Sequence, residues 1–267
     1  MTSHFPTPTD DSATESVQVR HDGAVAWVTI DRPPVNAITL ADYRTIGETF
    51  ARLSGRSDVN CVILTGAGTR AFCAGLDLQE FLASGVEEDP ARAMVVRSAF
   101  ESVRTCAVPI VAAVNGPALG AGAVLASVCD IRIAAESATF GMPEINVGRC
   151  GGGAYLGRLI PQGALRRMFF TGEPIPAAEA YRLGLVEEVC PSEELTQRAE
   201  ALARKIAAKS PLGLRYGKSA LNEIEGMPVE RGYPVEQGYS TRLMHTHDAR
   251  EATLAVVEKR APVWTGR

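Results

Sequence analysis

Short apolar segments alternate with amphipathic ones through the first half of the chain. Each apolar segment is rich in aliphatic side chains and is bounded by glycine, proline or polar residues, which is typical of a buried strand. Such strands are predicted over residues 24–30, 60–65, 110–114 and 130–134. The segments between them have a helical spacing of apolar residues or consist of small residues, and helices are predicted over 40–53, 91–106 and 119–128. This order predicts an α/β fold around a buried sheet.

The pattern changes after about residue 160, where helical periodicity dominates. Helices are predicted over 162–170, 177–183, 192–208, 211–225, 230–244 and 248–259, and an extended segment over 185–190. We therefore divide the chain into a polar tail over residues 1–16, expected to be disordered, an α/β core over 17–205, and a helical C-terminal region over 206–267.

The stretch from Thr105 to Cys129 carries no charged residue, so it has to be tested as a membrane span. It contains two prolines and three glycines, and this density of helix-breaking residues favours a strand, a turn and a buried helix. The N-terminal residues are polar and lack the apolar core of a signal peptide. We expect no membrane association and a cytoplasmic location.

Charge and cysteine content exclude further classes of protein. The 27 Lys and Arg residues are outnumbered by 31 Asp and Glu residues, whereas nucleic-acid-binding proteins usually show a basic excess. Six cysteines without CxxC spacing predict reduced, mostly buried thiols rather than a disulfide framework or a zinc site. His245 and His247 are expected on different sides of one helix, which is a poor arrangement for a shared metal ion. We therefore expect no nucleic-acid partner and no metal.

The sequence GAGTRA (66–71) resembles a dinucleotide-binding fingerprint. That fingerprint requires a helix to begin at the glycines, and here AFCAGLDL with a further glycine follows instead. A simple turn after a strand is the favoured interpretation. A nicotinamide-dependent oxidoreductase remains an alternative that rests on this motif alone.

Two glycine-containing turns follow apolar strands, AFCAGLDLQEF (71–81) and NGPALGAGAVLASVCD (115–130). Unpaired backbone N–H groups at such turns and at helix N-termini can stabilise developing negative charge, and two that converge would form an oxyanion hole. Glycines also permit close packing of helices. The residues alone leave both interpretations open.

Together with CDIRIAAESATFGMPEINVGRCGGG (129–153) and EKRAPVWTGR (258–267), these turns resemble motifs of the enoyl-CoA hydratase/isomerase (crotonase) superfamily, over roughly residues 18–267. The resemblance implies a spiral of ββα units followed by helices that build a homotrimer or a dimer of trimers. It also implies an acyl-CoA substrate. No separate cofactor is then expected, because coenzyme A is part of the substrate.

The resemblance assigns the thioester carbonyl oxygen to the backbone N–H groups of Leu76 and Ala121. Ala121 stands where the family commonly has glycine, and it needs a negative φ there. Glu144 would move a proton at the α-carbon, and apolar neighbours should raise its pKa. Without the resemblance, a surface glutamate at the start of a helix would be the preferred interpretation of Glu144.

Further residues of the implied pocket are Ala74, whose backbone would line the adenine site, and Gly75, Gly120 and Val124. The resemblance places Lys259 where a neighbouring subunit can contact the CoA phosphates, although a solvated helix end explains it equally well. It also implies a structural role for Asp77. Arg149 and Cys150 are expected near the pocket, with a structural role favoured.

Val124 is the main departure from the family, because hydratases that use two glutamates carry the second carboxylate at this position. We expect an enoyl-CoA hydratase-type enzyme of fatty-acid or related acyl-CoA metabolism, with a single-glutamate Δ3,Δ2-enoyl-CoA isomerase as the close alternative. The C-terminal stretch also resembles the carnitinyl-CoA dehydratase branch, while Gly152 disfavours the dienoyl isomerase branch. A catalytically weak acyl-CoA-binding protein is a further alternative.

Overall fold

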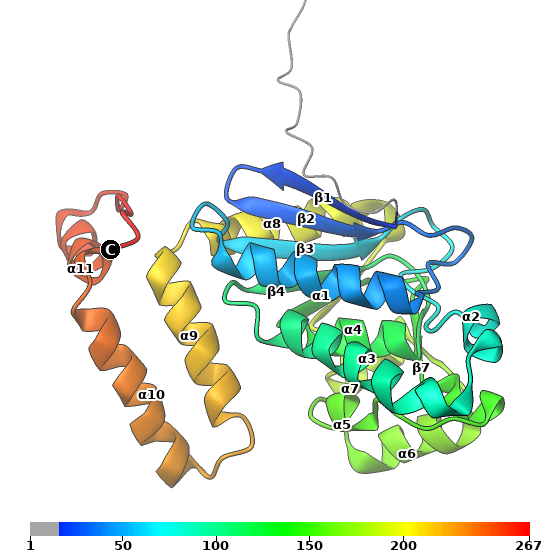
Figure 1. Cartoon of the computed structure of the whole chain (residues 1–267). Coiled ribbons are helices and arrows are strands. Elements are labelled where there is room, and N and C mark those ends of the chain that lie inside the picture. The colour runs from blue at the N-terminus through cyan, green and yellow to red at the C-terminus, as the bar shows by residue number, and fades with distance from the viewer. Residues whose placement is uncertain (1–15) are drawn as a thin grey trace, which may run out of the picture.

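A six-stranded sheet forms the centre of the computed structural model, which describes residues 16–267 (Figure 1). Its order is β1-β2-β3-β4-β6-β9, with β1 antiparallel to β2 and all other neighbours parallel. The strands are β1 (Val17–Asp22), β2 (Val25–Ile30), β3 (Cys61–Gly66), β4 (Ile110–Val114), β6 (Ile131–Ala135) and β9 (Glu188–Cys190). Parallel neighbours require crossover connections, which the intervening helices supply.

Both faces of this sheet are covered. The helices α1 (Leu40–Gly55) and α3 (Asp89–Arg104) lie on one face and α8 (Leu195–Ala207) lies on the other (Figure 1). Alternate residues of β3 therefore enter different apolar clusters, with Val62 and Leu64 on the α1 side. Ile63 packs on the α8 side. Burial on both faces explains why the central strands are continuous apolar runs rather than alternating ones.

A second, smaller sheet has the order β5-β7-β8 and consists of short strands. These are β5 (Ala118–Leu119), β7 (Thr139–Gly141) and β8 (Ile175–Pro176). Two isolated bridges, Ile38 with Leu76 and Cys73 with Ala118, connect the loop after β3 to the start of α1 and to β5. The loops that carry both glycine turns are therefore fixed by strand-like pairing.

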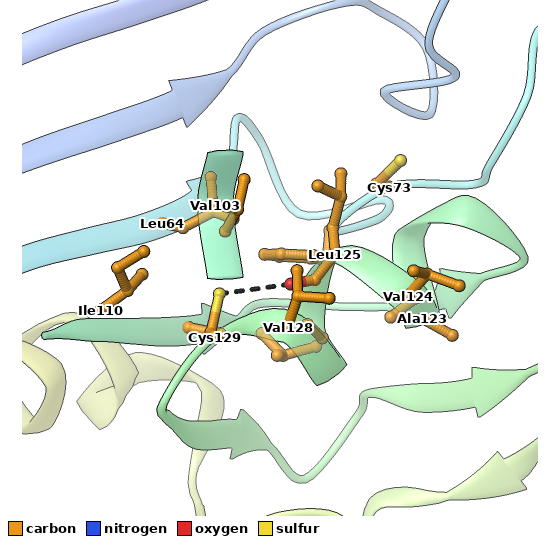
Figure 2. Close-up of a cluster of buried hydrophobic side chains, with 14 of the residues drawn as sticks. Leu64, Cys73, Val103, Ile110, Ala123, Val124, Leu125, Val128 and Cys129 are labelled. Carbon is orange, nitrogen blue, oxygen red and sulfur yellow. Dashed lines mark hydrogen bonds between the residues drawn. The ribbon is translucent and has the colours of Figure 1, made fainter. Parts of the chain in front are cut away.

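Short helices complete the core. They are α2 (Leu78–Ala83), η1 (Val86–Glu88), α4 (Ala121–Val128), η2 (Pro143–Val147), α5 (Gly153–Leu156), α6 (Gln162–Thr171), α7 (Ala177–Leu183) and η3 (Ser192–Glu194). The helix α4 consists of small and aliphatic residues and is almost wholly buried. Figure 2 shows Val124, Leu125 and Val128 of α4 within the surrounding apolar cluster.

Three helices follow the core, α9 (Pro211–Ile224), α10 (Val229–Met244) and α11 (His247–Glu258), and they lie to one side of the sheet (Figure 1). The helices α9 and α10 pack against each other. Polar contacts join α9 to the core, because the Lys218 ammonium lies 2.7 Å from the Asp130 carboxylate and Arg215 donates to the Ser54 carbonyl at 2.7 Å.

The predicted α/β fold with a helical C-terminal region is confirmed, and the predicted strands and helices agree with the structure to within a few residues. The strands β1, β5, β7 and β8, the helices α2 and α5 and the short helices η1 and η2 were not predicted. The histidine pair was wrongly assigned to one helix, since His245 ends α10 and His247 begins α11. Within residues 16–267, no group of His, Cys, Asp and Glu side chains is arranged to hold a metal ion.

The apolar stretch 105–129 divides into β4, β5 and α4, as expected from its breakers. Over the described residues, no helix has the length and apolarity needed to cross a membrane. Residues 1–15 of the predicted tail lie outside the described part of the chain. Ser16 is joined to the core, because its hydroxyl donates to the Asp42 carboxylate and its carbonyl accepts from Asp31 N at 2.9 Å.

Candidate active site

Main-chain hydrogen bonds hold the two glycine turns together. Phe72 N and Cys73 N donate to the Pro117 carbonyl at 3.1 and 3.2 Å, and Leu119 N donates to the Cys73 carbonyl at 3.0 Å. Gly122, in the first turn of α4, permits this approach, because a Cβ there would lie 2.0 Å from the Cys73 carbonyl oxygen. The close packing of the two turns therefore requires glycine at this position.

Each turn presents a backbone N–H group without an acceptor in the described part of the chain. Ile38 N donates to the Gly75 carbonyl and Asp77 N donates to the Ile38 carbonyl, so that Leu76 N points away from this pairing. Ala121 N belongs to the first residue of α4, where N–H groups have no partner within the helix. These are the two donors that the resemblance implied.

The two donors lie close together. Gly75 adopts φ +100°, and a Cβ built on it would lie 3.6 Å from Ala121 N. Gly120 adopts φ +53°, so glycine is favoured at the residues that precede both donors. Ala121 does not adopt a positive φ, which agrees with the expectation that alanine needs a negative φ at this position.

Glu144 lies in η2, and its carboxyl group faces the second turn. A Cβ on Gly120 would lie 2.9 Å from Glu144 Oε1, and Oε2 is buried without a hydrogen-bond partner among residues 16–267. Burial raises the pKa of the carboxyl group, and a hydrogen bond from its own backbone N–H opposes this in part. The side chain is thus a half-buried acid beside the Ala121 donor rather than a solvated surface group.

The prediction that apolar side chains surround Glu144 is only partly correct. Phe140 and Met142 are buried, whereas Ile145 and Val147 are 46% and 45% exposed. The short helix η2 turns these two side chains outward. The carboxyl group owes its burial to the walls of the cavity that it lines.

A cavity of about 610 Å³ joins these groups. It contains most of the expected site residues in its lining, namely Ala74, Gly75, Leu76, Gly120, Ala121, Val124 and Glu144. Lys259 is not part of the lining within one chain; it ends α11 with φ +55°. A concave, mostly apolar pocket with a few convergent polar groups is typical of a small-molecule site.

One wall of the cavity is aromatic and was not predicted. Tyr43 and Phe100 meet edge to face with ring centroids 5.7 Å apart, and Phe100 meets Tyr155 in the same way at 5.7 Å. All three side chains line the cavity. The helical spacing of Tyr43 correctly indicated a buried face of α1, but periodicity does not distinguish a packed core from a cavity wall.

Positions 124 and 152 carry no acid in this cavity. Val124 is 2% exposed, and its Cγ2 would lie 2.6 Å from a Cβ on Gly152. Gly152 itself has φ +76°, which disfavours other residues there. A reaction at this site therefore has the Glu144 carboxylate but none at these two positions.

Asp77 and Glu80 fix the first turn. The Asp77 carboxylate accepts from Gln79 N and Glu80 N at the start of α2 and pairs with Arg32 at 2.7 Å. The Glu80 N–H and the Arg32 guanidinium lower the pKa of Asp77. Glu80 in turn accepts from Leu40 N at 2.9 Å. These contacts agree with the structural role expected for Asp77.

Arg149 and Cys150 line the cavity as expected. Arg149 pairs with Asp89 at 2.9 Å and its guanidinium lies 4.5 Å from the centre of the Phe81 ring. These contacts join the segment after η2 to the start of α3 and to α2. A structural role for Arg149 is consistent with them, while Cys150 is exposed.

The GAGTRA segment forms a turn and does not open a helix. Asn115 donates to the Gly66 and Gly68 carbonyls at 2.9 and 2.8 Å, and the next helix begins only at Leu78. A phosphate site of the expected kind needs the N-terminus of a helix at the glycines. The structure therefore gives no support to a dinucleotide site here.

Comparison with known proteins agrees with this geometry. Residues 20–267 match the family model described as enoyl-CoA hydratase/isomerase. This chain belongs to the enoyl-CoA hydratase/isomerase family. It is 34% identical to a short-chain-enoyl-CoA hydratase from Clostridium acetobutylicum over 92% of this chain and 95% of the relative. It is also 34% identical to a carnitinyl-CoA dehydratase from Salmonella typhi, over 95% of this chain and 99% of the relative.

Solved structures confirm the crotonase fold. An enoyl-CoA hydratase from Bacillus anthracis matches with a TM-score of 0.91 and 33% identity, covering 95% of this chain and all of the other. DspI from Pseudomonas aeruginosa matches with a TM-score of 0.92 and 32% identity, covering 96% and 99%. The enoyl-CoA hydratase/isomerase fold explains why two sheets and a C-terminal set of helices occur in this order.

Replacing Glu144 with glutamine should stabilise the folded chain at neutral pH. The raised pKa means that the folded state binds the carboxyl proton more tightly than the unfolded chain does. The protonated carboxyl group therefore stabilises the fold fully at low pH, and this stabilisation is lost as the pH rises through the folded-state pKa. We expect the variant to be more stable than the parent at pH 7 and the difference to be smaller at pH 4. Urea unfolding at the two pH values measures this, and an equal stability at both would contradict a destabilising ionised Glu144.

Proposed function

We propose that this family member hydrates a 2-enoyl-CoA thioester reversibly. The observation that carries the proposal is that two unpaired N–H groups, of Leu76 and Ala121, share a cavity with the half-buried Glu144 carboxyl group. Oriented donors in such a site stabilise an enolate oxygen more strongly than water does, because they need no reorganisation. The relative named as a short-chain-enoyl-CoA hydratase supports this choice.

In the proposed reaction, the thioester oxygen accepts hydrogen bonds from Leu76 N and Ala121 N. The oxygen of water bonds to the β-carbon while the Cα=Cβ electron pair moves toward the carbonyl and forms the enolate. The Glu144 carboxylate accepts a proton from the water and then gives it to the α-carbon, which restores the carboxylate. Coenzyme A takes part only as the carrier of the acyl group.

The absence of a carboxylate at Val124 favours a second candidate, a Δ3,Δ2-enoyl-CoA isomerase. In that reaction Glu144 would take a proton from the α-carbon and return it to the γ-carbon, and no water would be needed. The carnitinyl-CoA dehydratase relative supports a third variant, in which a β-substituted acyl group loses water. All three reactions pass through an enolate or dienolate whose oxygen would be held by the same two N–H groups.

Incubation with crotonyl-CoA in H₂¹⁸O separates these reactions. The proposal expects 3-hydroxybutyryl-CoA that carries one ¹⁸O. A parallel reaction with 3-butenoyl-CoA that yields crotonyl-CoA without labelled product would instead identify an isomerase. Binding of both thioesters without turnover would overturn the proposal in favour of an acyl-CoA-binding protein.

Hydration should depend on pH through the Glu144 carboxyl group. The carboxylate must be ionised to accept the proton of water, and burial raises its pKa. The rate kcat/KM should therefore fall on the acid side at a higher pH than an exposed glutamate, with a pKa of about 4.3, would produce. A pH–rate profile measures this, and an acid limb at or below the ordinary glutamate value would contradict it.

We also propose that residues 206–267 form the contact region of a homotrimer or a dimer of trimers, next to the core over 17–205. Large apolar side chains of α10 and α11, including Val229, Met244 and Val256, are 71–78% exposed, and a neighbouring subunit would bury them. Lys259 would then reach the CoA phosphates of that neighbour's site. Light scattering with and without residues 206–267 tests the assembly.

A further inference from the structure

Tyr43 is a polar side chain in the cavity to which neither the family resemblance nor the proposed mechanism assigns a role. The residue is only 2% exposed, it lines the cavity, and its hydroxyl makes no hydrogen bond with another residue of 16–267. Edge-to-face contact with Phe100 holds the ring in place. The hydroxyl oxygen is not enclosed by protein atoms and faces the cavity, where a water or a substrate oxygen would bind it.

The position of Tyr43 relative to the catalytic groups follows from α1. Ile38, two residues before the start of α1, pairs through its backbone with the loop that carries Leu76. Leu40 and Tyr43, one turn apart on α1, both line the cavity. Tyr43 therefore stands one turn beyond the oxyanion loop, on the cavity side of the helix.

The hydroxyl remains protonated at neutral pH. Burial raises the pKa of Tyr43, and the nearby Glu144 carboxylate raises it further. Tyr43 can thus donate a hydrogen bond beside the Glu144 carboxylate but cannot replace it as a base. This is the property required of a group that holds an oxygen without exchanging a proton.

We propose that the Tyr43 hydroxyl holds the oxygen that bonds to the β-carbon, a task for which Val124 and Gly152 offer no polar side chain. The proposal rests on the proposed hydration. Tyr43 donates a hydrogen bond to the incoming water, whose oxygen bonds to Cβ, while Glu144 takes one proton of that water and passes it to Cα. In the reverse reaction the same hydroxyl holds the departing oxygen, and the phenol keeps its proton throughout.

Three other polar side chains of the cavity are less suited to this task. Arg149 is engaged with Asp89 and with the Phe81 ring. Arg92 is engaged with Glu80 at 3.0 Å. Tyr155 is only half-buried at the far end of the aromatic wall. Tyr43 combines a ring that is almost wholly buried with a hydroxyl that faces the cavity and makes no hydrogen bond with another residue of 16–267.

Replacement of Tyr43 by phenylalanine tests the proposal, because it removes the hydroxyl and keeps the ring contact with Phe100. We expect kcat for crotonyl-CoA hydration to fall about 10- to 100-fold, with KM changed less than about threefold. Exchange of the α-protons of butyryl-CoA with D₂O should remain within about threefold, because it requires the N–H donors and Glu144 but no oxygen on Cβ. Tyr181→Phe, at an exposed position on α7, is the matched control and should leave both rates unchanged.

The outcomes separate this proposal from the proposed function. A Y43F protein that hydrates as fast as the parent overturns the role of Tyr43 alone. An equal loss of hydration and proton exchange also overturns it, since a structural role would lower both. A parent protein that exchanges α-protons but adds no water overturns the proposed hydration and the Tyr43 role together. Loss of hydration with proton exchange and the melting temperature retained supports the proposal.

Discussion

Replacement of Glu144 by glutamine should lower kcat for crotonyl-CoA hydration by about 10²- to 10⁴-fold, the usual contribution of a positioned acid–base group. The amide has nearly the same size and can still lie beside Gly120, but it cannot accept a proton from water or return one to the α-carbon. KM should change little, because the N–H groups of Leu76 and Ala121 and the cavity walls remain in place. Steady-state hydration kinetics measure the effect.

The matched control is Glu136→Gln, the same substitution at an exposed position after β6. It should leave kcat and KM unchanged. If E144Q kept the parental rate of hydration, Glu144 would have no part in proton transfer. If E144Q failed to bind the thioester at all, the carboxyl group would serve binding rather than chemistry.

Replacement of Gly122 by alanine should separate the two N–H donors. The new Cβ would lie 2.0 Å from the Cys73 carbonyl oxygen, which belongs to the backbone and cannot rotate away. Either α4 or the loop before Leu76 must shift, and the loss of one aligned donor costs about 10²- to 10³-fold in kcat in known oxyanion holes. The strain should also destabilise the fold by about 1–3 kcal/mol.

Kinetics and urea unfolding of G122A measure the two effects together. Gly163→Ala is the matched control, because Gly163 lies in α6 with no atom within 4 Å of the added Cβ. That variant should keep full activity and lose no stability, since alanine favours a helix over glycine by about 0.5–1 kcal/mol. Parental activity in G122A would contradict the convergence of the two turns.

The longer strands and helices could be predicted because the hydrophobic pattern of each fits only one type of element. Apolar runs such as 110–114 are buried on both faces, and amphipathic segments such as 40–53 bury one face, so the hydrophobic pattern determines both. The strand β1 was missed because only Val17 and Val19 of its six residues are apolar, so the alternation is too short to indicate a strand. The two-residue strands β5 and β8 are too short to have a period at all.

The functional groups were predictable to different extents. The donors Leu76 and Ala121 and the acid Glu144 were located by the family resemblance, and the structure brings all three to one cavity. The close packing expected of the glycines is present, and the positive φ values are compatible with the predicted oxyanion hole. Gly75 and Gly120 adopt positive φ before the donors, and Gly122 allows the turns to pack.

The sequence by itself determined the order of the central strands and long helices and the two glycine turns, because these depend on local pattern and on residue type, whereas Glu144 was identified by the family resemblance. Only the tertiary structure decided that the two turns meet, that Glu144 rather than its neighbours faces them, and that Tyr43 lines a cavity instead of a packed core. Those facts depend on contacts between segments that are distant in the sequence, around residues 43, 75, 121 and 144. The periodicity within one segment does not indicate which distant segment it will contact.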